Sequence, residues 1–349
     1  MRFLGNQEPD PWFAARGMPD MLVPDWVKKN VVFIGTKQDG KFIPRATGFL
    51  VGFEDQQFMF TYVVTAEHVI AALQTEGHDI YCRFNRTDHG VEYLKVPPDY
   101  WYFHPNENER TDVALFGYIP HEYVEFNCQP LSGKLEAVAT AEVMMQMNIG
   151  LGDEIFIVGL FKSHHGKQRN VPIIRIGNIA AMRDEPVWTE YCGFVDAYLI
   201  EARSIGGLSG SPVVVSTPPM RVVDGTIKFS EGRQFYLLGL MHGHFDIQNL
   251  TEDTVRDAPQ QGGGINTGIG VVIPVEKIIE TVNHPDVKKT RDKIVANLRK
   301  TGAKADVLKD TEAFVIQGPP PSSESSTHQE DFKRLLDAAA RKQKPAGQT

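Results

Sequence analysis

The 349-residue chain has few cysteines, no long apolar run and no excess of basic charge, and each shortage excludes a class of protein. Cys82, Cys128 and Cys192 are odd in number and far apart, so they indicate no disulfide framework and favour a reducing compartment. Nowhere do about 18 apolar residues run together, which argues against a membrane span. Lys and Arg number 36 against 44 Asp and Glu, and this net charge of −8 does not favour nucleic-acid binding.

The first 20 residues also lack the basic start, the continuous apolar run and the small-residue cleavage site of a signal peptide. We therefore expect a cytoplasmic protein that binds neither a membrane nor nucleic acid. Hydrophobic residues make up 42% and charged residues 23%, the balance of an ordinary globular chain. The length allows two domains, or one large all-β domain with appendages.

Short apolar runs, separated by turn residues, fill the chain from about residue 31 to residue 243. They predict strands at 31–37, 42–45, 48–53, 58–65, 80–84, 113–117, 154–158, 173–179, 197–202, 212–215 and 235–242. One short helix is expected at 66–73, directly after a strand. Many short strands with few helical periodicities predict an all-β barrel or sandwich.

The pattern changes near the end of the chain. Residues 269–274 predict a last strand, and helices are expected at 276–282 and 286–300. Residues 318–327 (GPPPSSESST) have the composition of a flexible linker.

Beyond this linker, Thr327 and Glu330 fit a capping box, and an apolar stripe follows at helical spacing. So short an amphipathic helix is marginal on its own. We expect it either to pack on the core or to dock on a protein partner.

Three local patterns carry residues of one chemistry, in the order histidine, aspartate, serine. The motif TAEH ends in His68, where a predicted strand gives way to a helix. The motif TDVAL contains Asp112, at the start of an apolar strand. The glycine-rich turn GGLSGSP contains Ser209, just before another buried strand.

Amide hydrolysis at neutral pH needs a nucleophile with a base beside it, a carboxylate that orients the base, and donors for the oxyanion. Glycines around Ser209 allow a sharp turn that aims the backbone N–H groups of Gly207 and Ser209 into one small space. Each pattern alone is more often structural, because helix-start histidines, turn aspartates and Gly-Ser-Gly turns are common. Together, in this order, they predict a catalytic triad.

On these motifs the chain resembles the trypsin-like serine peptidases of the chymotrypsin fold. TAEH is similar to their TA-x-H motif, TDVAL to D-[IV]-A-L, and GLSGSP to G-D-S-G-G-P. TGIGVVIP at 267–274 looks like the closing strand of the high-temperature-requirement branch. The resemblance covers residues 31–282 and implies an all-β fold of two six-stranded antiparallel β-barrels, followed here by C-terminal helices. No PDZ-like stretch follows it.

The resemblance also divides the chain. Residues 1–30 are an N-terminal extension, and 31–285 are the peptidase domain, whose barrels separate near 120–145. Residues 286–317 are a helical extension, and 318–349 hold the linker and the short amphipathic helix.

The resemblance implies a serine endopeptidase that acts on protein or peptide substrates through an acyl-enzyme, with no cofactor and no metal. By position, His68 is the general base and then the acid, Asp112 orients it, and Ser209 is the nucleophile. The backbone N–H groups of Gly207 and Ser209 form the oxyanion hole.

The resemblance also implies substrate-binding residues. Leu240, His242, Gly243 and His244 align with the strand that pairs with the substrate backbone. Arg203 aligns with the base of the specificity pocket, and a positive pocket predicts cleavage after Asp or Glu. The plainer alternative is that Arg203 faces solvent or pairs with a nearby carboxylate.

Leu208 stands where digestive relatives carry an aspartate that receives the freed N-terminus. Activation by N-terminal cleavage is therefore not expected, and the oxyanion loop must be preformed or ordered by substrate or a partner. Two alternatives stay open: a latent or inactive barrel that serves as a peptide-binding or scaffolding module, and an esterase or single-site processing peptidase. His164 and His165 in KSHHGK predict a solvated hairpin tip, and a metal on His242 and His244 is the minor alternative for that strand.

Overall fold

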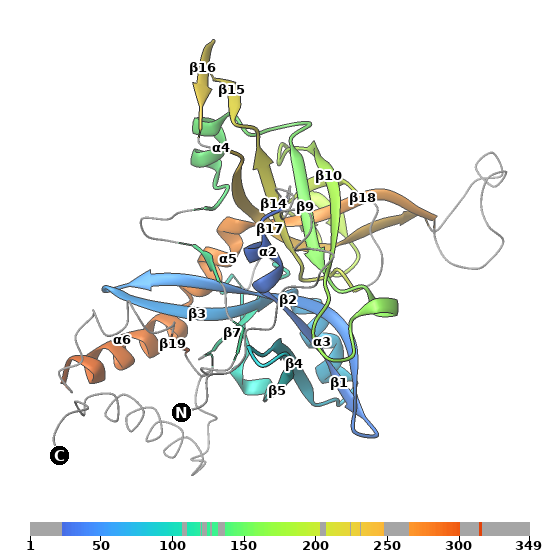
Figure 1. The fold of residues 1–349 in the computed structure, drawn as a ribbon, viewed down its shortest axis with the longest axis vertical. Helices are drawn as coiled ribbons and strands as arrows, with labels where there is room; N and C mark the ends of the chain where they lie inside the picture. The colour runs from blue at the N-terminus through green and yellow to red at the C-terminus, as the bar shows by residue number, and fades with distance from the viewer. Residues whose placement is uncertain are drawn as a thin grey trace, which may run out of the picture.

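A computed structural model gives the fold of the chain (Figure 1). It describes residues 23–106, 110–118, 120, 124–125, 128–131, 137–202, 207–223, 225–230, 232–247, 265–300 and 314–315. Residues 1–22 of the expected N-terminal extension 1–30 lie outside the described residues, and so does all of 318–349 with its terminal amphipathic helix. Strands predominate in the described part, as expected from the short apolar runs.

The N-terminal half forms most of a nine-stranded sheet. Seven strands follow the order β5-β4-β1-β2-β3-β7-β6, and β8 and the late strand β19 pair in parallel with β2 and β3. Its strands are β1 (Val31–Gln38), β2 (Lys41–Asp55), β3 (Phe58–Thr65), β4 (Ile80–Asn85), β5 (Val91–Val96), β6 (Tyr102–Phe103), β7 (Ala114–Gly117), β8 (Gln129–Pro130) and β19 (Phe314–Val315). Helix α2 (Asp25–Lys29) precedes the sheet, α3 (Glu67–Thr75) follows β3, and the 3-10 turn η1 (Pro98–Tyr100) precedes β6.

The C-terminal half closes into a six-stranded antiparallel barrel with the order β10-β13-β18-β17-β14-β9. Its strands are β9 (Glu154–Gly159), β10 (Ile173–Ala181), β13 (Tyr198–Glu201), β14 (Pro212–Thr217), β17 (Gln234–Ile247) and β18 (Ile265–Pro274). This barrel confirms the predicted fold class. The N-terminal half differs in detail from the predicted six strands, because additional short strands join it and the pairing among its described residues does not close into a ring.

The two runs expected at 42–45 and 48–53 form one strand, β2. Pro44 lies opposite Gly35, at a shift in the register between β1 and β2. The pairing moves from Ile34 opposite Ala46 to Gly35 opposite Pro44, so Arg45 is the extra residue of a bulge. A bulge is one of the few places where a sheet accepts proline.

Two hairpins stand apart from these sheets, β11 (Val187–Thr189) with β12 (Gly193–Val195), and β15 (Met220–Val223) with β16 (Thr226–Phe229). The second projects from the barrel beyond α4 (Ala141–Met147), at the top of Figure 1. Met220, Val222, Ile227 and Phe229 are all more than half exposed there. The Asp-Gly pair at 224–225 is a hairpin signal that our sequence analysis did not use.

Helices α5 (Val275–Val282) and α6 (Pro285–Lys300) follow the last barrel strand, close to the bounds expected from the sequence. Arg291 of α6 is 1% exposed, although it belongs to a polar stretch of the helix. Its guanidinium donates to Asp55 Oδ2 at 2.8 Å and to the Tyr62 hydroxyl at 3.1 Å. It also donates to the Val282 carbonyl at 2.6 Å. The bonds to Asp55 and Tyr62 connect α6 to β2 and β3 of the N-terminal sheet.

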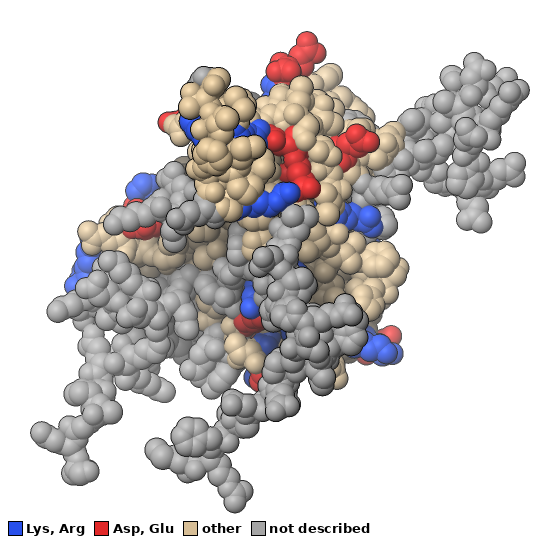
Figure 2. All heavy atoms as spheres, turned by 45° about the horizontal axis from the view of Figure 1, so that its top comes forward, with Lys and Arg blue, Asp and Glu red and all other residues tan. Residues whose placement is uncertain are grey.

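Among the described residues, none of the helices combines the length and the apolarity needed to cross a membrane. On the face shown in Figure 2, basic and acidic side chains are interspersed rather than gathered by sign.

Candidate active site

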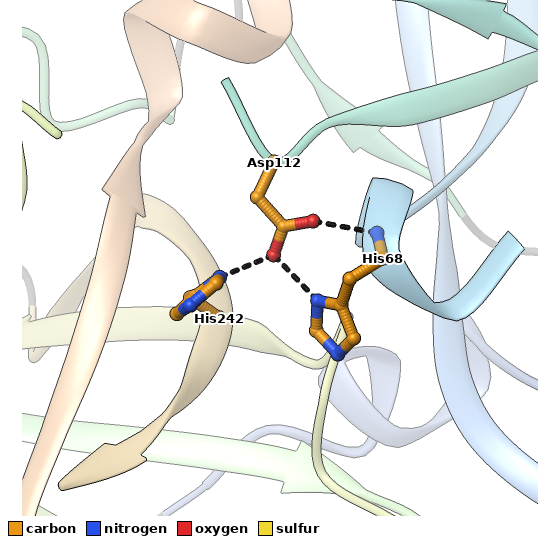
Figure 3. A group of neighbouring side chains, drawn as sticks. All are labelled: His68, Asp112 and His242. Atoms are coloured by element: carbon orange, nitrogen blue, oxygen red, sulfur yellow. Dashed lines mark hydrogen bonds and ion pairs between the residues drawn. The ribbon is translucent and has the colours of Figure 1, made fainter. Parts of the chain in front are cut away.

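His68 lies at the N-terminus of α3, and Asp112 lies in the segment that leads into β7. His68 Nδ1 is 2.8 Å from Asp112 Oδ2, and the His68 backbone N–H donates to Asp112 Oδ1 at 2.8 Å (Figure 3). The first N–H groups of a helix have no partner within it, and Ala66 at the N-cap has no side-chain acceptor. Asp112 therefore caps α3 from another segment and orients the imidazole at the same time.

The environment keeps this carboxylate ionised. Asp112 is fully buried, and burial alone would raise its pKa, but the charge and hydrogen bonds of His68 and His242 outweigh burial and hold the pKa far below its usual range. For His68, burial lowers the pKa, while the charge and hydrogen bond of Asp112 act more strongly in total and raise it. An ionised carboxylate is only an acceptor, so His68 Nδ1 carries the hydrogen and Nε2 is left as the basic atom.

A second histidine contacts the same carboxylate oxygen. His242 Nδ1, from β17, lies 2.5 Å from Asp112 Oδ2 (Figure 3). The two imidazole rings meet edge to face, with their centroids 5.3 Å apart. The sequence placed His242 on a strand wall but gave no signal that it faces Asp112, because that pairing joins residues 130 positions apart.

The turn that carries Ser209 is held between the two halves of the fold. Thr47 of β2 donates its backbone N–H to the Ser209 carbonyl at 3.1 Å and its hydroxyl to the Gly207 carbonyl at 2.8 Å. On the other side, the Gly210 N–H donates to the Met241 carbonyl at 2.8 Å. Leu208 is 1% exposed and packs in the core of the barrel, so apolar contact helps to hold the turn.

Gly210 brings this turn against the segment that precedes His68. A Cβ at Gly210 would clash with Thr65 Oγ1 and the Thr47 carbonyl and would lie 3.0 Å from the Ala66 nitrogen. Ser209, next to Gly210, is thus close to the junction between β3 and α3. Within the described residues, no hydrogen bond joins the Ser209 hydroxyl to His68. Gly207 is buried and has a φ of 109°, as a sharp turn requires, while residues 203–206, including Arg203, lie outside the described part.

We expect Gly210→Ala to abolish reaction of Ser209 with active-site reagents and to destabilise the fold by more than about 2 kcal/mol, because the methyl group meets backbone and Thr65. Gly77→Ala is the matched control, since Gly77 also has positive φ (69°) but nothing within 4 Å of the added Cβ. It should cost about 1 kcal/mol and leave the site intact. Urea unfolding and covalent labelling would measure both effects. Equal effects of the two variants would contradict the packing of the turn on β3.

The tip of the β11–β12 hairpin covers one side of His68. The Tyr191 ring meets the His68 ring edge to face at 5.6 Å, and its hydroxyl donates to Glu67 Oε1 at 3.2 Å. Arg110 lies 4.0 Å over the Tyr191 ring. Burial raises the pKa of the Cys192 thiol to about 12, and the charges of Asp112 and Glu67 add to this, so the thiol is neutral and a poor nucleophile. Sequence reasoning found no role for Glu67, Arg110 or Tyr191.

The residues predicted to bind substrate occupy β17. Leu240 is buried, so its side chain offers no surface for a substrate. Its backbone already pairs with Pro212 on one side and Ile273 on the other. The pairing of β14 with β17 ends at Leu240, just before His242 and Gly243. His242 contacts Asp112 instead of standing only on a pocket wall, and substrate pairing at 242–244 stays a prediction.

The fold can be compared with solved structures. The apo MamO protease domain from Magnetospirillum magneticum is 17% identical, with 73% of this chain and 96% of that chain covered and a TM-score of 0.41. Deg5 is 15% identical, with coverages of 74% and 89% and a TM-score of 0.41. An inactive form of Rv3671c from M. tuberculosis H37Rv is 17% identical, with coverages of 79% and 93% and a TM-score of 0.39.

The fold class rests on the strand pairing of this chain itself, a closed six-stranded antiparallel barrel beside a nine-stranded sheet. No protein-family model matches the chain, and neither does any curated protein.

Proposed function

We propose that the chain is a serine endopeptidase in which Ser209 is the nucleophile, His68 the general base and Asp112 its orienting carboxylate. The observation that carries the proposal is the 2.8 Å contact of His68 Nδ1 with the buried Asp112. The contacts of the glycine turn with Thr47 and with β17 support it, because they hold Ser209 near the same junction.

The proposed reaction follows from these groups. His68 Nε2 accepts the Ser209 proton as the hydroxyl attacks the peptide carbonyl, and Asp112 stabilises the imidazolium that forms. The N–H groups of Gly207 and Ser209 would receive the oxyanion. The imidazolium then protonates the leaving amine, and a water activated by His68 hydrolyses the acyl-enzyme. Every proton moves through His68 Nε2, so the bond at Nδ1 must persist throughout.

A second candidate is a latent form that binds peptides without cleaving them. It is favoured by one observation, that no hydrogen bond joins Ser209 to His68 within the described residues. Bonds of this kind are often long in unliganded enzymes and shorten on substrate binding, which is why we rank the active peptidase first.

Labelling with a fluorophosphonate separates the two candidates. The reagent phosphonylates a serine only where a base activates it, so we expect the wild-type chain to be labelled and both Ser209→Ala and His68→Ala to be unlabelled. Ser163→Ala, in the exposed loop after β9, is the matched serine control and should be labelled like wild type. Lack of labelling in folded wild-type protein would favour the latent form.

The remaining expectations belong to this proposal. All three cysteines are free thiols, which supports a reducing compartment such as the cytoplasm. A protein or peptide substrate, with an acidic residue before the scissile bond, is proposed as predicted from Arg203. A cleavage profile dominated by Lys and Arg would overturn that preference.

A further inference from the structure

One oxygen of Asp112 faces the Nδ1 atoms of two histidines from opposite halves of the fold. The distances are 2.8 Å to His68 and 2.5 Å to His242. The side chain of Asp112 is 0% exposed, and those of His68 and His242 are 26% and 11% exposed. Water therefore cannot solvate the carboxylate. The two imidazole rings stabilise its negative charge through the contacts of their Nδ1 atoms. Such a position attracts a cation that can use all three groups.

The same three side chains form a ligand set that zinc prefers, two imidazole nitrogens and one carboxylate oxygen. One ligand atom from each lies within 4.8 Å of the others. Tetrahedral zinc with bonds of about 2.0–2.1 Å places its ligand atoms about 3.3 Å apart and the centroids of two bound imidazoles about 5 Å apart. The observed centroid separation is 5.3 Å, close to this value, and the ligand nitrogens of the two rings lie within 4.8 Å of each other.

The Asp112 oxygen lies closer to both nitrogens than a zinc site allows. It would withdraw from the two nitrogens by about 0.5–0.8 Å to reach zinc-site spacing, a shift within the range of a small carboxylate rotation. Water could complete the coordination from the side on which His68 is exposed. Among the described residues, no other group of three histidine, cysteine, aspartate or glutamate side chains comes as close together.

We propose that His68, Asp112 and His242 bind one zinc ion, which replaces the two hydrogen bonds they now share. In a neutral imidazole, zinc at Nδ1 requires the ring proton to move from Nδ1 to Nε2. No proton is lost in this exchange, but His68 Nε2 becomes a donor and can no longer accept the Ser209 proton. Zinc is therefore a reversible inhibitor of the peptidase, and this consequence, unlike the binding itself, rests on the proposed function.

Calorimetric titration of the full-length, chelator-treated protein with ZnCl2 at pH 7.5 tests the site. We expect one zinc ion per chain, and weakening by roughly 10- to 100-fold or more in His242→Gln and in Asp112→Asn, which remove ligands from different segments. The double variant His164→Gln/His165→Gln removes an exposed and a partly exposed histidine remote from the site in sequence and should leave the affinity unchanged. MgCl2 should give no binding, because magnesium prefers an all-oxygen octahedral site.

A measurement on wild-type protein avoids dependence on any variant. Zinc should abolish the Nδ1–H proton resonances of both rings in the NMR spectrum, and a chelator should restore them. Absence of binding by folded wild-type protein would overturn the site, and so would binding that His242→Gln and Asp112→Asn do not weaken.

The same preparation distinguishes the proposed metal site from the proposed peptidase activity. Fluorophosphonate labelling is measured in chelator and again with zinc. Zinc binding through these residues, with no labelling in chelator, would support the metal site and contradict the peptidase. Labelling in chelator that zinc does not suppress would contradict the metal site and leave the peptidase standing.

Discussion

Replacing Asp112 by Asn is expected to slow acylation of Ser209 by about 10⁴-fold, the loss that the equivalent change causes in the chymotrypsin-type triad. Three N–H donors point at the carboxylate, two from His68 and one from His242. An asparagine offers one oxygen and one NH2 group, so at least one N–H donor would face another donor. If the NH2 group faces His68 Nδ1, the ring proton moves to Nε2 and the base is lost.

The effect is measured as the rate constant for fluorophosphonate labelling, with circular dichroism as a check on folding. Asp79→Asn is the matched control, because Asp79 is exposed and pairs only with Lys95 in the described contacts. It should react within about twofold of wild type, as surface changes usually do. A labelling rate for Asp112→Asn within tenfold of wild type would contradict the assigned role of Asp112.

Replacing Arg291 by Ala is expected to lower the free energy of unfolding by about 3 kcal/mol, the lower end of the usual cost for a buried ion pair, because the Asp55 side chain is 20% exposed. The change leaves Asp55 without its cation and the Val282 carbonyl without a side-chain donor. It also removes the guanidinium that lies 4.8 Å over the Phe53 ring. Helix α6 would then lose its main polar attachment to the N-terminal sheet.

Urea unfolding of both Arg291→Ala and Lys288→Ala would test this attachment. Lys288 lies one turn earlier on α6, is exposed and pairs with Asp292, so its loss should cost less than about 0.5 kcal/mol. Similar costs for the two variants would mean that Arg291 contributes no more than a surface cation.

The sequence predicted the β-rich fold and brought His68 and Asp112 together correctly, because both belong to short motifs whose residue types report local geometry. It could not predict that His242 contacts Asp112. Alternation along a strand shows that His242 and His244 share a face, but not which residue lies opposite that face. The burial of Arg291 could not be predicted for the same reason. Arginine counts as polar in a helical pattern, and such a pattern places it on the solvent side of α6.

The sequence predicted two strands, at 42–45 and 48–53, where the structure has the single strand β2. A bulge at Arg45 lets the pairing of β2 with β1 continue past Pro44. Tyr191 and Glu67 were missed because they meet only when the β11–β12 hairpin reaches across to α3. Such contacts depend on the packing of distant segments, which local patterns do not encode.

The contacts of Thr47 have a consequence for biosynthesis. Its hydroxyl joins Gly207 and Leu160, which lie 160 and 113 residues further along the chain. During translation, His68 and Asp112 leave the ribosome well before the Ser209 turn exists, and the turn gains its contacts with Thr47 only when the barrel docks on β2. Contacts this distant in sequence form late in folding. Under the proposed function, the complete site of His68, Asp112 and Ser209 would therefore exist only after the two halves of the fold have docked.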